Sequence, residues 1–329
     1  MSYCMSFHDV ISEIESETCS FPVVDAHLHR VDFLQESDGL RSLLERMDAA
    51  GVTGCVVFGL QVVKKWAAWE PDRPCYYLDD NAKCYTFVAT DELLMNDYMS
   101  LEPSERSRFV PLLCGFNPTD RNAVHHVERK LASQDPWMGI GEILCRHDDL
   151  TNLTMEETAR MDHPALFPVY DLAGSRDLPV LLHQNSSSVG HHERFEYLSE
   201  VRKALDAFPG TTFVWAHCGI SRRVGHKLYH RMVDEMLQEY SNLMMDLSWV
   251  VYDQTVCRNH VPKKSWLDLI SKYPERFMLG SDLCGHFEFL GKTMARYDQL
   301  LELLGSGERL MLASGNAERT WKMASQSSQ

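Results

Sequence analysis

Eight short runs rich in β-branched and aromatic residues alternate along this chain with longer stretches of helical periodicity. Such an alternation predicts parallel strands joined by crossover helices. Eight is the number of strands that closes a (β/α)8 TIM barrel, so this is the fold we expect. The expected strands are residues 23–29, 54–59, 109–116, 139–144, 179–184, 212–217, 243–248 and 276–282.

The stretches between these runs have the pattern of helices with one apolar face. Val201, Leu205 and Phe208, for example, recur at helical spacing, so we expect this face to pack on the barrel wall. A further helix within residues 7–14 could plug the base of the barrel. The other expected helices include residues 39–50, 122–132, 197–208, 227–240, 264–272 and 293–304.

The longest departure from this rhythm is residues 61–108, which contain Trp66, Trp69 and a helical stretch around residues 92–99. Because this segment follows the second strand, we interpret it as an insertion on the face where the carboxyl ends of the strands open. There it could form a lid or a pocket wall. The two tryptophans either stack on a substrate or close a small core within the insertion itself.

The length of 329 residues exceeds the roughly 250 residues of a typical barrel, which leaves room for long loops but not for a second full domain. We therefore expect one domain over residues 1–329, with residues 1–20 as an N-terminal extension. A hydrophobic fraction of 44% with 24% charged residues is too apolar for general disorder, so a packed core is expected.

The formal charge of −15 gives a field that repels nucleic acid. Residues 1–18 lack the basic start and apolar run of a signal peptide, and no other segment approaches the ~18 to 20 apolar residues of a membrane span. The ten cysteines contain no CxxC pair, and those in apolar runs are expected to be buried thiols. We expect a soluble, cytoplasmic protein with a small-molecule substrate and with neither nucleic acid nor membrane as a partner. The sequence leaves open whether it forms a homo-oligomer.

The first expected strand ends in two histidines separated by one residue. His27 and His29 lie in the motif DAHLH, directly after the apolar residues 21–24. Residues i and i+2 of a strand point to one face, so both imidazoles can bind a single metal ion from the strand end. An HxH pair is common by itself. At the end of the first strand of a barrel it indicates a metal site.

Four other expected strands each carry one more potential ligand, namely Glu142, His183, His217 and Asp282. Glu142 lies among glycines and aliphatic residues, where an unpaired carboxylate is costly. The alternative for Glu142 is a surface position on a misassigned strand, and a lone histidine at a strand end is more often structural. In a (β/α)8 barrel, however, the carboxyl ends of the strands converge. Six ligands on five strands therefore predict one metal centre.

The chain resembles the amidohydrolase superfamily of metal-dependent hydrolases and is most similar to its second large amidohydrolase group. The resemblance extends over residues 25–321 and includes the segment SGNAER at residues 314–319, which is similar to the family's Gly-Asn-Ala-x-Arg ending. In that family the strand-one HxH, the strand-five and strand-six histidines and the strand-eight aspartate are the functional set. The matching residues here are His27, His29, His183, His217 and Asp282.

Glu142 bears on the number of metal ions that the resemblance implies. Many relatives carry a carboxylated lysine at this point as a bridge between two metals, and others have no ligand there and a single metal. The Gly-Glu-Ile at residues 141–143 resembles the branch that bridges with glutamate. This implies two divalent cations, with Zn²⁺ favoured and Mn²⁺ or Fe²⁺ also compatible with histidine and carboxylate ligands.

The resemblance also implies a mechanism. His27, His29 and Asp282 would bind one cation, and His183 with His217 the other. A hydroxide formed from metal-coordinated water would attack an amide, lactone or other ester bond of a small molecule, and Asp282 would carry its proton to the leaving group. With only one metal, His217 would be free to act as an acid or base or to stabilise an oxyanion.

Three residues beyond the strand ends are candidate substrate contacts, namely Arg146, Arg222 and Trp249. Arginine binds a carboxylate or phosphate with paired hydrogen bonds, although a solvated loop arginine fits the sequence equally well. Two other functions stay open. A decarboxylase would use one metal, and a catalytically silent barrel acting as a binding module would have lost its ligands. The Gly-Glu-Ile segment also suggests a deoxyribonuclease, against which the negative charge argues.

Overall fold

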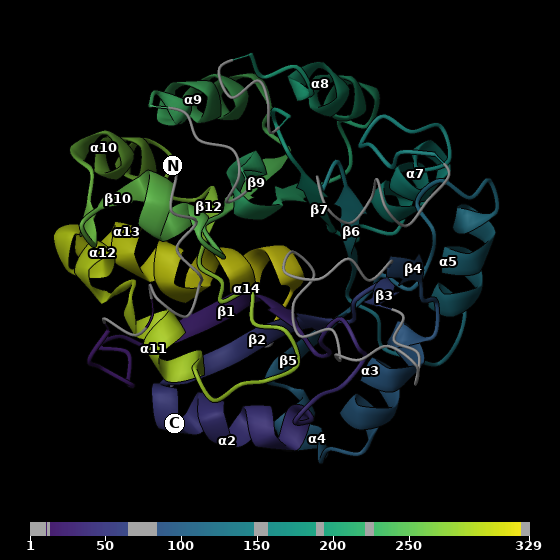
Figure 1. The fold of residues 1–329 in the computed structure, drawn as a ribbon, viewed down its shortest axis with the longest axis horizontal. Helices are drawn as coiled ribbons and strands as arrows, with labels where there is room; N and C mark the ends of the chain where they lie inside the picture. The colour runs from purple at the N-terminus through teal and green to yellow at the C-terminus, as the bar shows by residue number, and fades with distance from the viewer. Residues whose placement is uncertain are drawn as a thin grey trace, which may run out of the picture.

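The centre of the molecule is a barrel of eight parallel strands, each paired with the next in chain order (Figure 1). The computed structural model describes residues 11, 14–64, 84–147, 157–188, 194–220 and 227–323. The strands are β1 (Val23–His29), β2 (Val52–Phe58), β5 (Phe109–Leu113), β6 (Gly139–Cys145), β7 (Val180–Gln184), β8 (Phe213–Trp215), β9 (Leu243–Asp246) and β12 (Phe277–Met278).

Backbone hydrogen bonds join the end of the last strand to the first and close the barrel. The N–H of Ala26 donates to the carbonyl of Leu279 over 2.8 Å, and the N–H of Asp282 donates to the carbonyl of His27 over 2.8 Å. The regular ladder of β12 is shorter than the sequence suggested because the chain turns soon after it, with Asp282 at a φ of 59°. The expected (β/α)8 barrel is confirmed.

A β-bulge in β1 decides which of its side chains face the barrel interior. The register with β2 shifts between Asp25 and Leu28, where three steps along β1 match two along β2. Such a bulge reverses the alternation of a strand. Ala26 therefore packs in the inner core, and its neighbour His27 nevertheless faces the same side, followed by His29 two residues later.

Inward-facing apolar side chains fill the barrel, and the last helix, α14 (Asn316–Trp321), closes its base. Trp321 is fully buried among these inward side chains. Asn316 donates from its side-chain amide to the carbonyl oxygens of Pro274 and Phe277, 2.7 Å away in each case. These bonds hold α14 against the start of β12, so the base is a packed core and not an opening.

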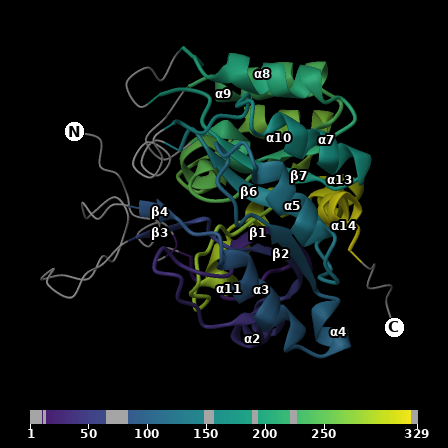
Figure 2. The ribbon, with the colours of Figure 1, turned by 90° about the vertical axis from the view of Figure 1, so that its right-hand side faces the viewer.

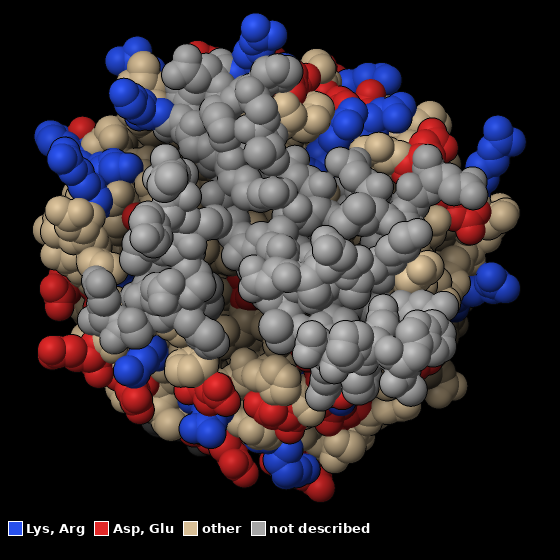
Figure 3. Space-filling view, in the orientation of Figure 1, with Lys and Arg blue, Asp and Glu red and all other residues tan. Residues whose placement is uncertain are grey.

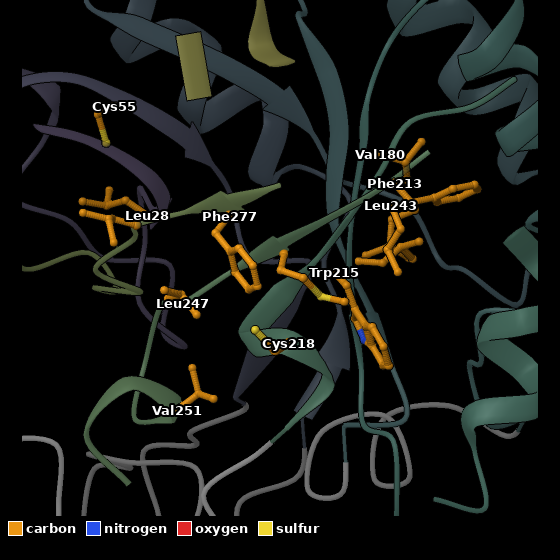
Figure 4. Close-up of a cluster of buried hydrophobic side chains, with 14 of the residues drawn as sticks. Leu28, Cys55, Val180, Phe213, Trp215, Cys218, Leu243, Leu247, Val251 and Phe277 are labelled. Atoms are coloured by element: carbon orange, nitrogen blue, oxygen red, sulfur yellow. The ribbon is translucent and has the colours of Figure 1, made fainter. Parts of the chain in front are cut away.

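Helices cover the outside of the barrel and bury the outward side chains of the strands. Val201 and Leu205 of α8 are buried, as their spacing predicted, and Phe208, directly after the helix, is partly buried against the same core. Figure 4 shows Val180, Phe213 and Leu243, from three neighbouring strands, side by side in this outer core. The helices are α2 (Leu40–Ala50), α3 (Thr90–Met99), α4 (Pro103–Arg106), α5 (Ala123–Leu131), α7 (Phe167–Ser175), α8 (Leu198–Ala207), α9 (Tyr229–Glu239), α10 (Lys264–Lys272), α11 (Leu290–Ala295), α12 (Asp298–Leu303) and α13 (Ser306–Leu310).

The single helix expected over residues 293–304 is two helices, α11 and α12, because the chain turns between them. The two residues at this turn direct polar groups into the barrel wall. The hydroxyl of Tyr297 lies 2.8 Å from the carbonyl oxygens of both Leu247 and Gly280, and the buried guanidinium of Arg296 donates to that hydroxyl. These contacts favour the break over a continuous helix.

Within residues 61–108, which we interpreted as an insertion, the described residues form α3, α4 and an antiparallel pair of strands, β3 (Val62–Lys64) and β4 (Cys84–Thr86). In Figure 2 this strand pair lies at the end of the barrel opposite to α14. Trp66 and Trp69 lie outside the described residues, as does most of the helix expected at residues 7–14. None of the described helices combines the length and hydrophobicity needed to cross a membrane.

Candidate metal centre

Six polar side chains that lie on or just after five of the strands meet at the carboxyl end of the barrel. The four histidines and the glutamate are at most 4% exposed, and the side chain of the aspartate is the most open of the six at 12%. All six were expected from the sequence to converge, and the structure brings them together. They are His27, His29, Glu142, His183, His217 and Asp282.

Glu142, on β6, stands between two pairs of histidines. Its Oε2 is 3.3 Å from Nε2 of His29, and its Oε1 is 3.7 Å from Nε2 of His27. The same Oε1 is 3.4 Å from Nδ1 of His183 and 3.7 Å from Nε2 of His217. Glu142 therefore completes two groups of three potential ligands, one with the histidines of β1 and one with those of β7 and β8.

Asp282, after β12, faces the same nitrogens from the other side. Its Oδ1 is 3.3 Å from Nε2 of His27 and 3.4 Å from Nε2 of His29. Its Oδ2 is 3.9 Å from Nε2 of His217. The aspartate thus approaches the β1 histidines most closely, as the resemblance implied.

The far nitrogens of two of the histidines are held by oxygen acceptors. Nδ1 of His29 is 2.9 Å from the carbonyl oxygen of Gly59, so this nitrogen carries the proton and donates it. Nε2 of His183 is 3.2 Å from the side-chain oxygen of Asn185. The near nitrogen of each ring is then the one that a metal ion can bind, in exchange for any proton that it carries.

Asp246 and Ser248, at the end of β9, hold the far nitrogens of the other two histidines. Nδ1 of His27 is 2.7 Å from Oδ2 of Asp246, and Nδ1 of His217 is 2.7 Å from Oγ of Ser248. Sequence reasoning did not select Asp246. The signal was present, because Asp246 is an acidic residue in the apolar strand LMMD, as Glu142 is in β6.

Two buried polar atoms of the centre are aimed into the space between the six side chains. Among the described residues, neither Nε2 of His27 nor Oε1 of Glu142 has a hydrogen-bond partner. Buried lone pairs and carboxylates that face one another without a cation are strongly unfavourable. Nitrogen and carboxylate donors suit Zn²⁺, Mn²⁺ and Fe²⁺, so these residues fit the divalent cations that the resemblance implied.

Protons are the alternative to a metal ion at these sites. Burial by itself lowers the pKa of His29, but hydrogen bonds to Asp282 and Glu142 raise it overall to about 9. Burial lowers the pKa of His217 to about 4. Burial raises the pKa of Glu142, but His27 and the other imidazoles bring it well below its ordinary value. The carboxylates are therefore ionised at neutral pH and available to a cation.

Several residues at this end of the barrel have a positive φ angle, which is uncommon for residues other than glycine. The φ angles are 40° for Arg146, 53° for His217, 51° for Cys218, 58° for Trp249 and 59° for Asp282. Such conformations cost of order 1–3 kcal/mol each and persist only where the surrounding structure enforces them. Here they turn the chain as the strands end and direct His217 and Asp282 toward the centre.

Of the three candidate substrate contacts, one borders the centre, one is engaged in an ion pair, and one lies outside the described residues. The ring of Trp249 is 5.1 Å from that of His217, so this tryptophan borders the centre. The guanidinium of Arg146 is bound to the carboxylate of Glu200 at 2.5 and 3.0 Å and lies over Tyr197. Arg222 lies outside the described residues.

A buried histidine that the sequence reasoning did not select also borders the centre. The ring of His147 is 4.6 Å from that of His183 and 6.3 Å from that of Trp249. Burial lowers the pKa of His147 well below its usual value. A neutral imidazole therefore forms part of the wall. Farther out, Figure 3 shows basic and acidic side chains interspersed around the rim of the face seen in Figure 1.

A model of the amidohydrolase family matches residues 150–323, more than half of the chain. The chain belongs to the amidohydrolase family. The matched region contains His183, His217 and Asp282. This amidohydrolase is thus a metal-dependent hydrolase, as the resemblance predicted.

Solved structures with the same fold cover almost the whole amidohydrolase. An amidohydrolase from Burkholderia multivorans with bound zinc has a TM-score of 0.56 and 14% identity over 92% of this chain and 100% of that one. An uncharacterised TIM-barrel protein from Bordetella bronchiseptica has the same TM-score, identity and coverage of this chain, over 98% of its own length. A Pseudomonas putida protein described provisionally as a 2-pyrone-4,6-dicarboxylic acid hydrolase has a TM-score of 0.56 and 14% identity over 92% of this chain and 98% of its own. At this identity the likeness shows the fold alone. No curated protein matches the chain significantly.

Proposed function

We propose that this amidohydrolase hydrolyses an amide, lactone or other ester bond of a small molecule with two divalent cations bridged by Glu142. The observation that supports a bridge is the position of Glu142, whose two oxygens lie 3.3 to 3.7 Å from four histidine nitrogens. A carboxylate with four lone-pair positions can serve two cations at once. Zn²⁺ is favoured, since a protein of this fold contains zinc.

The six residues divide into two sets in this proposal. His27, His29 and Asp282 would hold one cation, and His183 with His217 would hold the other. When bound, the cations lower the pKa of a coordinated water and polarise the scissile bond. The protein's own part is to hold the six donors in place, exclude competing water and provide a proton acceptor.

Asp282 is the proposed proton carrier. Its side chain is the most exposed of the six, at 12% against 2% for Glu142, so it is the ligand best placed to meet a substrate. Burial raises the pKa of Asp282, but His217, His27 and His29 bring it far below its ordinary value, so the carboxylate is ionised at neutral pH. In this proposal Asp282 would take the proton of the attacking water and pass it to the leaving group.

Trp249 is the proposed pocket wall, because its ring lies beside His217 and His183. Arg146 would bind a substrate anion only by releasing Glu200. Arg222 remains a candidate from the sequence. A lactone is the substrate class to try first, because a 2-pyrone is a cyclic ester and the Pseudomonas putida protein is named for hydrolysis of one.

The test is metal content per chain, measured by elemental analysis of the wild type and of Glu142→Ala after reconstitution with Zn²⁺. Two equivalents falling toward one is expected, with Glu128→Ala on the surface of α5 as a control that keeps two. Lactones, esters and amides are then screened with the loaded enzyme. One equivalent in both proteins, with release of carbon dioxide from an aromatic acid, would favour a decarboxylase. Two equivalents without any cleavage would favour a binding module.

A further inference from the structure

Asp246 occupies a position behind the centre from which one carboxylate reaches two of its histidines. Both Asp246 and Ser248 are 0% exposed. Oδ2 of Asp246 bonds to Nδ1 of His27. Oδ1 bonds to the hydroxyl of Ser248, and that hydroxyl bonds to Nδ1 of His217. The two arms end on histidines from different strands.

The number of available protons fixes the direction of every bond in this chain. An ionised carboxylate can only accept, so Nδ1 of His27 is the donor to Asp246. Ser248 has a single hydroxyl proton, and the carboxylate receives it. The hydroxyl oxygen must then accept from Nδ1–H of His217. Both imidazoles thereby carry a proton on Nδ1, which leaves Nε2 as the nitrogen that can present a lone pair to a cation.

Both of these Nε2 atoms face the carboxylates of the centre. Nε2 of His27 is 3.3 Å from Asp282, and Nε2 of His217 is 3.7 Å from Glu142. The backbone N–H of Ser248 adds a bond of 2.7 Å to Asp246, which fixes the carboxylate itself. An outer carboxylate that orients a ligand histidine commonly contributes to metal affinity.

We propose that Asp246 is a positioning residue shared by both cation sites, holding His27 of one site directly and His217 of the other through Ser248. The reference to two sites rests on the proposed function. The positioning itself rests on the hydrogen bonds. Ser248 belongs to one arm only, so the two residues have separable effects.

Replacing Asp246 by asparagine cannot preserve both arms. If the amide oxygen faces His27, the amide nitrogen faces the hydroxyl and backbone N–H of Ser248, and the His217 arm loses its acceptor. If the amide is reversed, its nitrogen donates to Nδ1 of His27. The proton of that ring then moves to Nε2, where it blocks the metal. Ser248→Ala removes the His217 arm alone.

The experiment measures Zn²⁺ affinity of the full-length, metal-free protein by competition with a chromophoric chelator. We expect Asp246→Asn to weaken binding by roughly 10- to 100-fold, and Ser248→Ala to weaken one of the two sites. A His183→Ala background leaves the His27 site, and there Ser248→Ala should have no further effect while Asp246→Asn should. A His29→Ala background leaves the His217 site, where Ser248→Ala should again weaken binding.

Two variants control for the loss of a buried polar group as such. Asp91 is also 0% exposed and accepts backbone N–H bonds from Cys114 and Gly115, away from the histidines. Ser186 is equally buried and bonds to Tyr229. Asp91→Asn and Ser186→Ala should keep the wild-type Zn²⁺ affinity, whatever they do to the melting temperature.

The proposal is overturned if Asp246→Asn binds Zn²⁺ as the wild type does, or if Asp91→Asn loses as much affinity. A wild type that binds a single ion would overturn the bridged pair, and the effect of Asp246→Asn on that ion would still test the positioning. An enzyme that cleaves nothing would overturn only the proposed reaction.

Discussion

The two ends of the barrel are built from the same eight strands but differ in what they bury. At the base, Trp321 of α14 packs on inward-facing side chains that are almost all apolar. At the carboxyl end the interior holds histidines and carboxylates, four of the former and two of the latter within 4 Å of one another's polar atoms. Uncommon backbone angles occur at this end too, for example at His217 and Asp282.

This difference indicates that stability and chemistry are separated along the barrel axis. Burial of apolar surface at the base stabilises the fold. The grouped charges above it oppose folding until a cation or protons neutralise them. A substitution at the base should therefore change unfolding and leave the chemistry intact, and one at the carboxyl end should do the reverse.

The largest effect is expected at the carboxyl end, from Asp282→Asn. The amide cannot carry a proton and is a weaker metal ligand. The loss in kcat should approach the upper end of the roughly 10²- to 10⁴-fold that one acid–base group supplies, about 5 kcal/mol. Initial rates on the best substrate of the screen measure it. Circular dichroism should show an intact fold, and a variant that keeps more than a tenth of the activity would remove Asp282 from the proton path.

The matching change at the base is Trp321→Ala, which should cost about 3–5 kcal/mol of unfolding free energy. The indole is fully buried, so its removal leaves a cavity among the inward side chains. Urea unfolding measures the loss, and activity per folded molecule should stay at the wild-type value. A smaller effect on stability than that of His29→Ala in the metal-free protein would reverse the proposed division.

A smaller effect is expected from pH on the affinity for Zn²⁺. The pKa of His29, about 9 in the cation-free protein, lies above the ordinary value for histidine. Below that pH a metal ion must displace a proton, so affinity falls as pH falls, by about tenfold, or 1.4 kcal/mol, per unit for one proton. Chelator competition between about pH 6 and 9 tests this. An affinity that does not change with pH would contradict the raised pKa.

The smallest effect is expected from a substitution on the outer helices, which contribute neither to the packed base nor to the metal centre. Lys264 and Asp268 form an exposed ion pair one turn apart on α10. Such pairs contribute about 0.5 kcal/mol or less. Lys264→Ala should leave urea unfolding and Zn²⁺ content unchanged within that margin, and a larger loss would mean that the wall contributes more than its contacts indicate.

The sequence predicted the barrel and the six grouped side chains for one physical reason. Parallel strands in a closed sheet bring their carboxyl ends together, so a polar residue at the end of each apolar run identifies the centre without coordinates. Asp246 ends β9 in the structure, but the expected strand ran to residue 248, so the same rule did not select it.

Only the tertiary structure decided how these residues face one another. The bulge in β1 brings His27 to the inner side after Ala26, and strand periodicity gives no sign of it. The engagement of Arg146 by Glu200, 54 residues away, likewise depends on how α8 packs. Periodicity and strand ends are local properties that the sequence carries. Register and ion pairing are set by the balance of contacts between distant segments, which forms only when the chain has folded.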